Sequence, residues 1–454
     1  MAQAPRFFDV AGGDCLSKFT LRSHPFVAQT EQFLKHNSAM SRPIPLQESS
    51  ILAHRPFVLF WTGRVLATAA FQMQSVAVGW QVYELTDSAF DLGLVGLVQF
   101  LPMLLLALVT GHAADRYDRR KIVIACQVVK LLVAGALAAG SLYGGLPRAA
   151  MFAVLFVFGA ARAFEMPATS SLLPGIVPEA MLPRAIAGSA SANQAASIAG
   201  PALGGLLYAL GPAIAYAACG AAFLLCALCM GFIRASRTTR QREPVSLDSL
   251  FAGIRFIRSD PVILGAISLD LFAVLLGGAT ALLPIYAKDI LHVGPTGLGM
   301  LRGAPAIGAL AMSLFLARHP LRRRVGRTMF AAVGWFGGAT IVFALSSSFL
   351  LSLAALTLLG ASDMVSVVVR SSLIQLETPD AMRGRVGAVN SVFIGSSNQL
   401  GEFESGLTAA WFGVVPSVVI GGVGTLIVVL LWIRLFPKLA RTDRLAASRE
   451  KSVG

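Results

Sequence analysis

The chain has 454 residues, of which 56% are hydrophobic and only 13% are charged, and its mean hydropathy is +0.71. Soluble domains carry about 25% charged residues, so this composition excludes an ordinary soluble protein and indicates a membrane protein. The net charge of +14 lies in short gaps between apolar runs, which indicates membrane topology rather than nucleic-acid binding.

Residues 1–50 are polar and mixed in charge, and they lack the apolar core of a cleavable signal peptide. We predict a disordered cytoplasmic tail for this segment. Met40 is an alternative start to Met1, because Met-Ser-Arg-Pro leads directly into the first apolar run.

The rest of the chain predicts an all-α integral membrane protein. A helix that crosses a bilayer needs about 20 mostly apolar residues. Twelve transmembrane helices follow, at roughly 56–82, 91–113, 121–143, 149–173, 184–210, 213–233, 262–287, 296–317, 327–346, 349–373, 386–412 and 416–436. We therefore predict two six-helix halves (51–233 and 261–437), a central cytoplasmic linker (234–260) and a cytoplasmic C-terminal tail (438–454).

The positive charges sort between two sets of loops. One set is crowded with arginines, whereas the opposite set offers little beyond Arg148 and Lys288. Because cationic loops stay on the cytoplasmic side, the crowded loops and both termini are predicted to be cytoplasmic. We expect a multi-pass protein of a bacterial inner membrane.

The second half repeats the first. Aligning 159–206 with 360–407 at a constant offset of 201 gives thirteen identities in 48 positions without a gap. Earlier spans agree more loosely, with Gly96-x5-Pro102 matching Gly299-x5-Pro305. Parallel repeats of this kind are typical of transporters in which one half rocks against the other, and they predict two pseudo-symmetric halves.

A short charged loop separates the second and third predicted spans, with the pattern Gly111-x-x-x-Asp115-Arg116-x-x-Arg119-Arg120. It resembles the signature loop of the major facilitator superfamily, except that Asp118 stands where that family more often has glycine. The resemblance implies the major facilitator fold and a latch on the cytoplasmic side. In such a latch Gly111 would permit close helix contact, Asp115 would accept hydrogen bonds, and the arginines would reach acids or carbonyls. The alternative is that the arginines only set the topology.

A second motif lies in the fifth predicted span. Gly200, Pro201, Gly204 and Gly205 resemble the Gly-Pro-x-x-Gly-Gly core that marks exporters and antiporters in the superfamily. Small residues let helix backbones approach closely, and proline bends a helix. The alternative is a generic packing face. Further stretches, such as Arg162-Ala-Phe-Glu-x-Pro167, resemble the branch that includes bacterial enterobactin exporters, which favours efflux.

Charged residues inside predicted spans point to a functional site, because they are costly there. Our hypothesis is that four of them face a central cavity: Arg64, Arg162, Asp270 and Asp363. The arginines would bind anionic or polar parts of a substrate, and an aspartate would exchange a proton. The alternative is that these four groups form buried structural pairs across the interface between the two halves. We expect Glu165 to neutralise Arg162 one turn away.

Other charged residues in or near the spans are expected to reach the membrane surface rather than a substrate site. We expect Lys130 and Arg302 to extend their charged ends toward the membrane surface. Glu402 and Glu404 lie late in the eleventh span, where solvation near the surface is expected. The alternative is that they serve as periplasmic gate or proton-entry acids.

The sequence gives little support to an enzyme. It has no metalloprotease His pair, no serine nucleophile elbow and no phosphate-binding glycine loop with a lysine. No catalytic residue, metal site or cofactor is therefore predicted. The prediction is a monomeric secondary transporter in the lipid bilayer that exports a small molecule, such as a siderophore or amphiphilic drug, in exchange for protons. The alternatives are a facilitator or importer with the same fold, and a membrane receptor that does not transport.

Overall fold

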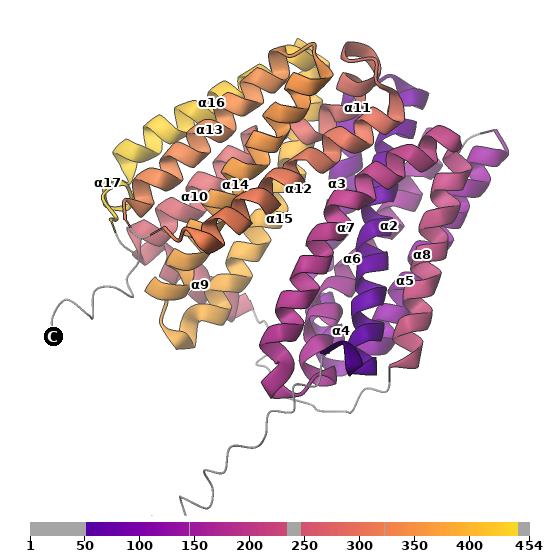
Figure 1. Cartoon of the computed structure of the whole chain (residues 1–454), viewed down its shortest axis with the longest axis horizontal. Helices are drawn as coiled ribbons and strands as arrows, with labels where there is room; N and C mark the ends of the chain where they lie inside the picture. Colours follow the sequence, from indigo (N-terminus) through magenta and orange to yellow (C-terminus); the bar gives the residue numbers. More distant parts are fainter. Residues whose placement is uncertain (1–50, 145, 234–246, 322, 444–454) are drawn as a thin grey trace, which may run out of the picture. The chain divides into compact units, whose positions relative to one another are not determined.

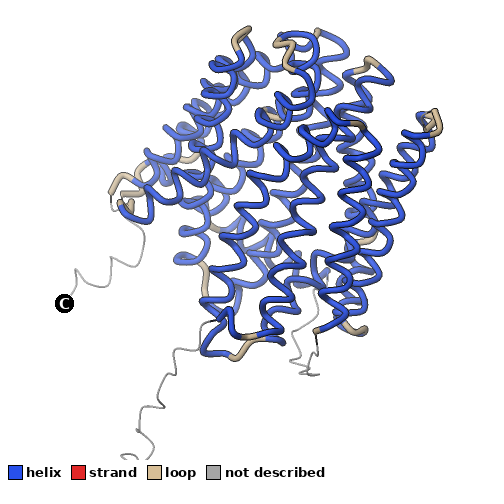
Figure 2. The backbone as a smooth tube through the Cα atoms, turned by 45° about the vertical axis from the view of Figure 1, so that its right-hand side comes forward, coloured by secondary structure: helices blue, strands red, loops and turns tan. Residues whose placement is uncertain are grey.

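The computed structural model describes residues 51–144, 146–233, 247–321 and 323–443, which form helices and turns with no strand among them (Figures 1 and 2). The predicted tail 1–50, part of the predicted linker and residues 444–454 lie outside this description. In the first part of the chain the helices are η1 (Ile51–Ala53), α2 (Arg55–Thr86), α3 (Ala89–Leu105), α4 (Ala107–Arg116), α5 (Arg119–Leu142), α6 (Arg148–Ile176), η2 (Glu179–Met181), α7 (Leu182–Leu210) and α8 (Pro212–Phe232).

The second part of the chain has the same all-helical character. Its helices are α9 (Leu247–Ser259), α10 (Pro261–Leu276), η3 (Ala279–Leu282), α11 (Leu283–Ile285), η4 (Tyr286–Ile290), α12 (Gly294–Arg318), α13 (Val325–Leu345), α14 (Phe349–Glu377), α15 (Asp380–Phe412), α16 (Val414–Leu435) and α17 (Pro437–Ala440).

Local chemistry explains several helix boundaries. Asp118 accepts a hydrogen bond from the backbone nitrogen of Arg120 at 3.0 Å, so the aspartate that replaces the family's usual glycine caps the start of α5. Asp260 caps α10 in the same way. Gly211 (φ +146°) and Gly413 (φ +90°) connect α7 to α8 and α15 to α16, in a backbone region that favours glycine. These one-residue turns place consecutive helices side by side.

Two of the predicted spans are not single helices. The span predicted at 91–113 is divided between α3 and α4, and the span predicted at 262–287 ends its α-helix at Leu276. The second break lies at a close contact with α15. A side chain at Gly278 would overlap the carbonyl oxygen of Gly401, so glycine lets the two backbones meet there.

The helices pack in two groups that correspond to the two parts of the chain. In the first, α2 packs on α7 and α8, while α5 packs on α6 and α8. In the second, α14 packs on α12 and α13, and α16 packs on α10 and α13. Figure 1 shows the first group in indigo to magenta and the second in rose to yellow. The groups are joined where α7 meets α12 and where α3 meets α15.

The outer surface is apolar. Large side chains such as Leu132, Trp335 and Leu430 are exposed, at 67%, 64% and 64%. Extensive apolar surface is unusual on a soluble protein and suits contact with lipid. By length and composition, eight helical segments among the described residues could cross a membrane. The helices α2, α7 and α15 are outside that set, and each has contacts with the opposite group, where polar and small residues are tolerated.

Candidate functional site

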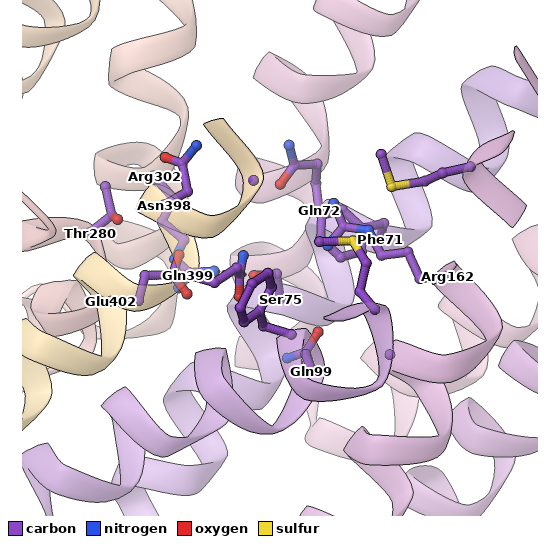
Figure 3. Close-up of a pocket in the computed structure, with 15 residues that line it drawn as sticks. Phe71, Gln72, Ser75, Gln99, Arg162, Thr280, Arg302, Asn398, Gln399 and Glu402 are labelled. Carbon is purple, nitrogen blue, oxygen red and sulfur yellow. Dashed lines mark hydrogen bonds between the residues drawn. The ribbon is translucent and has the colours of Figure 1, made fainter. Parts of the chain in front are cut away.

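A cavity of about 450 Å³ lies where the two groups of helices meet. Small-molecule sites commonly have volumes of ~300–1,000 Å³, so its size suits a small ligand. Helices α2, α3 and α6 line it from the first group, and η3, α12 and α15 line it from the second (Figure 3). We call it the central cavity. Its polar lining side chains are Gln72, Ser75, Gln99, Arg162, Thr280, Arg302, Asn398, Gln399 and Glu402.

Three ionisable side chains line the central cavity. Arg162 comes from α6, and its guanidinium carbon lies 3.9 Å from the centre of the Phe71 ring. Arg302 comes from α12 and donates a hydrogen bond to the Ser75 hydroxyl of α2. Glu402 comes from α15. Arg302 was expected to extend toward the membrane surface, and that expectation was wrong, because hydropathy locates a span but not the face of the helix that carries a residue. Glu402 lines the central cavity instead of lying solvated at the surface, which leaves the alternative of a gate or proton-entry acid open.

A second cavity of about 480 Å³ lies within the first group, between α2, α5, α6 and α7. Arg64, Arg162 and Glu165 all line it, so the structure brings these three predicted residues together. With its oxygen toward Arg64, the Asn193 amide accepts hydrogen bonds from Nε and an Nη at 2.6 and 2.9 Å. Arg162 lines both cavities and therefore stands between them.

Glu165 pairs with a residue that sequence reasoning did not assign to it. Lys130 of α5 forms an ion pair with Glu165 and is only 2% exposed, and Gln127 donates to the same carboxylate at 2.6 Å. The expectation that Lys130 extends to the surface was wrong. Because the carboxylate is engaged by Lys130 and Gln127, the direct hydrogen-bond partner of Glu165 is not Arg162.

The two aspartates lie elsewhere. Asp270 of α10 and Asp363 of α14 line a small pocket inside the second group, together with Ser362 and Ser366. Asp270 forms an ion pair with Arg370 of α14, and both side chains are buried, at 8% and 3% exposure. Arg370 was missed in the sequence, although an arginine within a predicted span is itself a signal.

The four predicted cavity charges are thus divided between two places. Neither aspartate is among the described residues that line the central cavity or the second cavity. Depth along a helix fixes the level of a residue in the bilayer, but each residue turns the side chain by about 100° around the axis. The structure places Asp270 in a buried pair with Arg370 inside the second group, which differs both from a cavity position and from a pair across the interface.

The charged loop after α4 contacts its own group of helices. Arg119 donates to the carbonyl of Ser171 at 3.3 Å, and Arg120 donates to the carbonyls of Ile233 and Gly231 at 2.6 and 2.8 Å. Arg116 is exposed, and the Asp115 side chain lies outside the described residues. Among the described residues, a side chain at Gly111 would meet no atom within 4 Å.

The glycine motif of α7 lies at crowded helix contacts. A side chain at Gly200 would come within 2.7 Å of Gln72, and one at Gly204 within 2.6 Å of the Met73 backbone. A side chain at Gly205 would overlap the carbonyl oxygen of Pro295 on α12. Reciprocally, one at Gly299 would overlap the carbonyl oxygen of Pro201. The motif therefore packs α7 against α2 and against the opposite group.

Polar contacts also join the two groups at the end predicted to be periplasmic. Lys288 of η4 lies 2.8 Å from the carboxylate of Asp87, which follows α2. Tyr83 of α2 donates a hydrogen bond to Asp289 of η4. These contacts and the α7–α12 packing hold the groups together at one end of the central cavity.

The fold and the cavity define a multi-pass membrane transporter of the major facilitator type. The chain belongs to the family described as transmembrane secretion effector, whose family model matches residues 48–452. This family and its relatives are transporters rather than enzymes.

Individual relatives support this assignment. The chain is 26% identical over 404 residues to an enterobactin exporter of Citrobacter koseri, covering 87% of this chain and 95% of the exporter. It is 25% identical over 375 residues to a macrolide efflux protein of Streptococcus pyogenes, covering 79% and 90%. The solved structure of a bacterial homologue of the iron transporter ferroportin shares the fold, with a TM-score of 0.66, 18% identity, and coverage of 86% and 100%. The chain is a membrane transporter whose relatives are exporters.

Proposed function

We propose that this transporter exports a small molecule across the bacterial inner membrane in exchange for protons, as a monomer with both termini in the cytoplasm. The central cavity supports the proposal best, because residues from both groups of helices line it. A site at such a junction can open to either side of the membrane as the groups rock, so that residues 51–233 and 261–437 would act as two moving halves. The names of the relatives suggest a siderophore or a macrolide as the first compounds to test.

The experiment compares a deletion strain with a strain that overproduces the protein. We expect the deletion to raise the intracellular level of the exported compound, and overproduction to raise its level in the medium, as measured by untargeted metabolomics. Purified protein in proteoliposomes would then be given a pH jump. Faster transport along the imposed gradient supports exchange with protons, whereas transport that ignores the gradient indicates a facilitator. No change in any compound would contradict export.

Asp363 is the carboxylate that we expect to carry the proton. Among the described residues, no hydrogen bond or ion pair engages it, whereas Asp270 is committed to Arg370. An unengaged carboxylate within a span can gain and lose a proton without breaking a structural pair. We therefore predict that Asp363→Asn lowers substrate-driven proton flux about tenfold or more, since proton transfer groups contribute roughly 10²–10⁴-fold where they act directly.

Glu377→Gln is the matched control, because Glu377 ends the same helix and does not line the small pocket that holds Asp363. Proton flux in the control variant should stay near that of the natural protein. Unchanged coupling in Asp363→Asn would show that this carboxylate is not the carrier.

A further inference from the structure

The charges of the central cavity are not matched within it. Arg162 and Arg302 supply two positive charges, and Glu402 supplies the negative charge that stands against them. Among the described residues, neither arginine has a carboxylate within 4 Å: Arg162 lies over the Phe71 ring, and Arg302 bonds the Ser75 hydroxyl. The Nε of Arg302 is buried and has no hydrogen-bond partner in the described part of the chain.

This arrangement differs from two other sets of charges in the spans. Lys130 is paired with Glu165, and Asp270 is paired with Arg370. Because unpaired charges in the membrane interior are costly, two arginines that line one cavity without a carboxylate within 4 Å are suited to receive an anionic ligand there. A guanidinium is suited to carboxylate, sulfonate or phosphate oxygens, which it binds through parallel hydrogen bonds.

The two arginines come from different groups of helices. Arg162 lies on α6 and Arg302 on α12, and Figure 3 shows both at the same cavity with Glu402 and Gln399 on α15. An anion held by both arginines would therefore contact both moving parts.

The rest of the lining suits a ligand that is polar in one part and apolar in another. The amides of Gln72, Gln99 and Gln399 supply further donors and acceptors, while Met103, Met166 and Phe100 supply apolar area.

We propose that the central cavity binds an anionic, partly apolar small molecule through Arg162 and Arg302, and that Glu402 is the internal carboxylate that this anion must outcompete. The proposal rests on the proposed function in taking this cavity as the substrate site. The anionic group approaches the two guanidinium groups, and its electrostatic gain is reduced by the like charge of Glu402. Glu402 thus tunes release, so that the arginines do not trap the anion.

The test uses two probes that differ in charge but hardly in shape, 1-naphthoate and 1-naphthamide. Their binding to the purified full-length protein in nanodiscs is measured by the probes' fluorescence. We expect the carboxylate to bind about tenfold tighter than the amide, since charge-assisted hydrogen bonds are roughly twice as strong as neutral ones. Arg162→Gln and Arg302→Gln should each lose that preference. Glu402→Gln should tighten naphthoate binding severalfold, because it removes a nearby like charge.

Matched controls separate this effect from a general loss of charge. Arg434→Gln removes an exposed arginine at the end of α16, and Glu404→Gln removes a carboxylate two residues from Glu402 that does not line the cavity. Both should bind the probes as the natural protein does. Thermal unfolding and size-exclusion chromatography confirm that each variant is folded. For a variant that does not fold, Arg→Lys replaces Arg→Gln at the same position, and it should weaken the preference because lysine lacks the planar fork.

Several outcomes would overturn the proposal. The first is that naphthoate binds no tighter than naphthamide, or that neither probe binds. The second is that the preference for naphthoate survives both arginine substitutions. The third is that Glu402→Gln binds naphthoate more weakly than the natural protein does. Discs of phosphatidylcholine and of phosphatidylglycerol distinguish the source of the anion. Equal binding in both supports a soluble ligand, whereas binding abolished in phosphatidylglycerol would assign the arginines to a lipid headgroup.

The test is independent of the export experiment. If the strains show export but the charge preference is absent, the substrate class is wrong and export stands. If the preference is present but no compound is exported, the cavity binds anions and the proposed function fails.

Discussion

Gly205→Leu should lower export about tenfold or more while the protein still reaches the membrane. A side chain at this position would overlap the carbonyl oxygen of Pro295, where α7 meets α12. The overlapped atom belongs to the backbone, so the helices themselves must separate. Overpacking of this kind costs ~1–3 kcal/mol, and ~1.4 kcal/mol corresponds to a tenfold change in an equilibrium. In one conformation the contact between α7 and α12 closes one end of the central cavity. We expect the population of that conformation to fall about tenfold or more, and the rate of export to fall with it.

A reciprocal variant and a control test whether the defect comes from the contact between α7 and α12. Gly299→Leu acts on the same contact from α12, because its side chain would overlap the carbonyl oxygen of Pro201, and it should reproduce the defect. Gly334→Leu on α13 is the control, since a side chain there meets no atom within 4 Å. Export from cells and the amount of each variant in the membrane are the measurements. Normal export by Gly205→Leu would show that this contact is not a seal.

Much of the fold could be predicted because the bilayer restricts the choices. Apolar runs of sufficient length indicate helices, and single glycines and capping aspartates mark their ends, as at Gly211, Gly413 and Asp118. The break after α10 could not be predicted in this way. It lies where Gly278 meets the backbone of Gly401, a contact between residues far apart in the sequence.

The candidate site was predicted only in part, for a related reason. Charges within spans were recognised as unusual, and Arg162 was placed at a cavity. Which helix face a charge occupies depends on packing, so Arg302 and Glu402 were assigned to the surface although both line the central cavity. The pairing of Asp270 with Arg370 joins α10 to α14, and no local pattern in the sequence indicates that partner.

The second prediction with a large effect concerns stability. Removing one partner of the Asp270–Arg370 ion pair should destabilise the protein strongly. Both side chains are nearly fully buried, at 8% and 3% exposure. Removing one partner of a buried pair costs roughly 3–5 kcal/mol, because the other charge remains buried and uncompensated. We therefore expect Arg370→Met and Asp270→Leu each to lower the unfolding temperature of the purified protein markedly. The double variant should recover most of the loss, since neither charge then remains.

The exposed pair of Asp380 and Arg383 is the control, with side chains 86% and 51% exposed. Surface pairs contribute about 0–1 kcal/mol, so Asp380→Asn should change stability little. Together with a further variant, Asp270→Asn, these proteins also separate a structural role of Asp270 from a role in transport. If Asp270→Asn unfolds easily and the Asp270→Leu/Arg370→Met protein is stable and still couples substrate to protons, Asp270 is structural and Asp363 remains the candidate carrier. A stable Asp270→Asn protein that has lost coupling would instead assign the proton to Asp270.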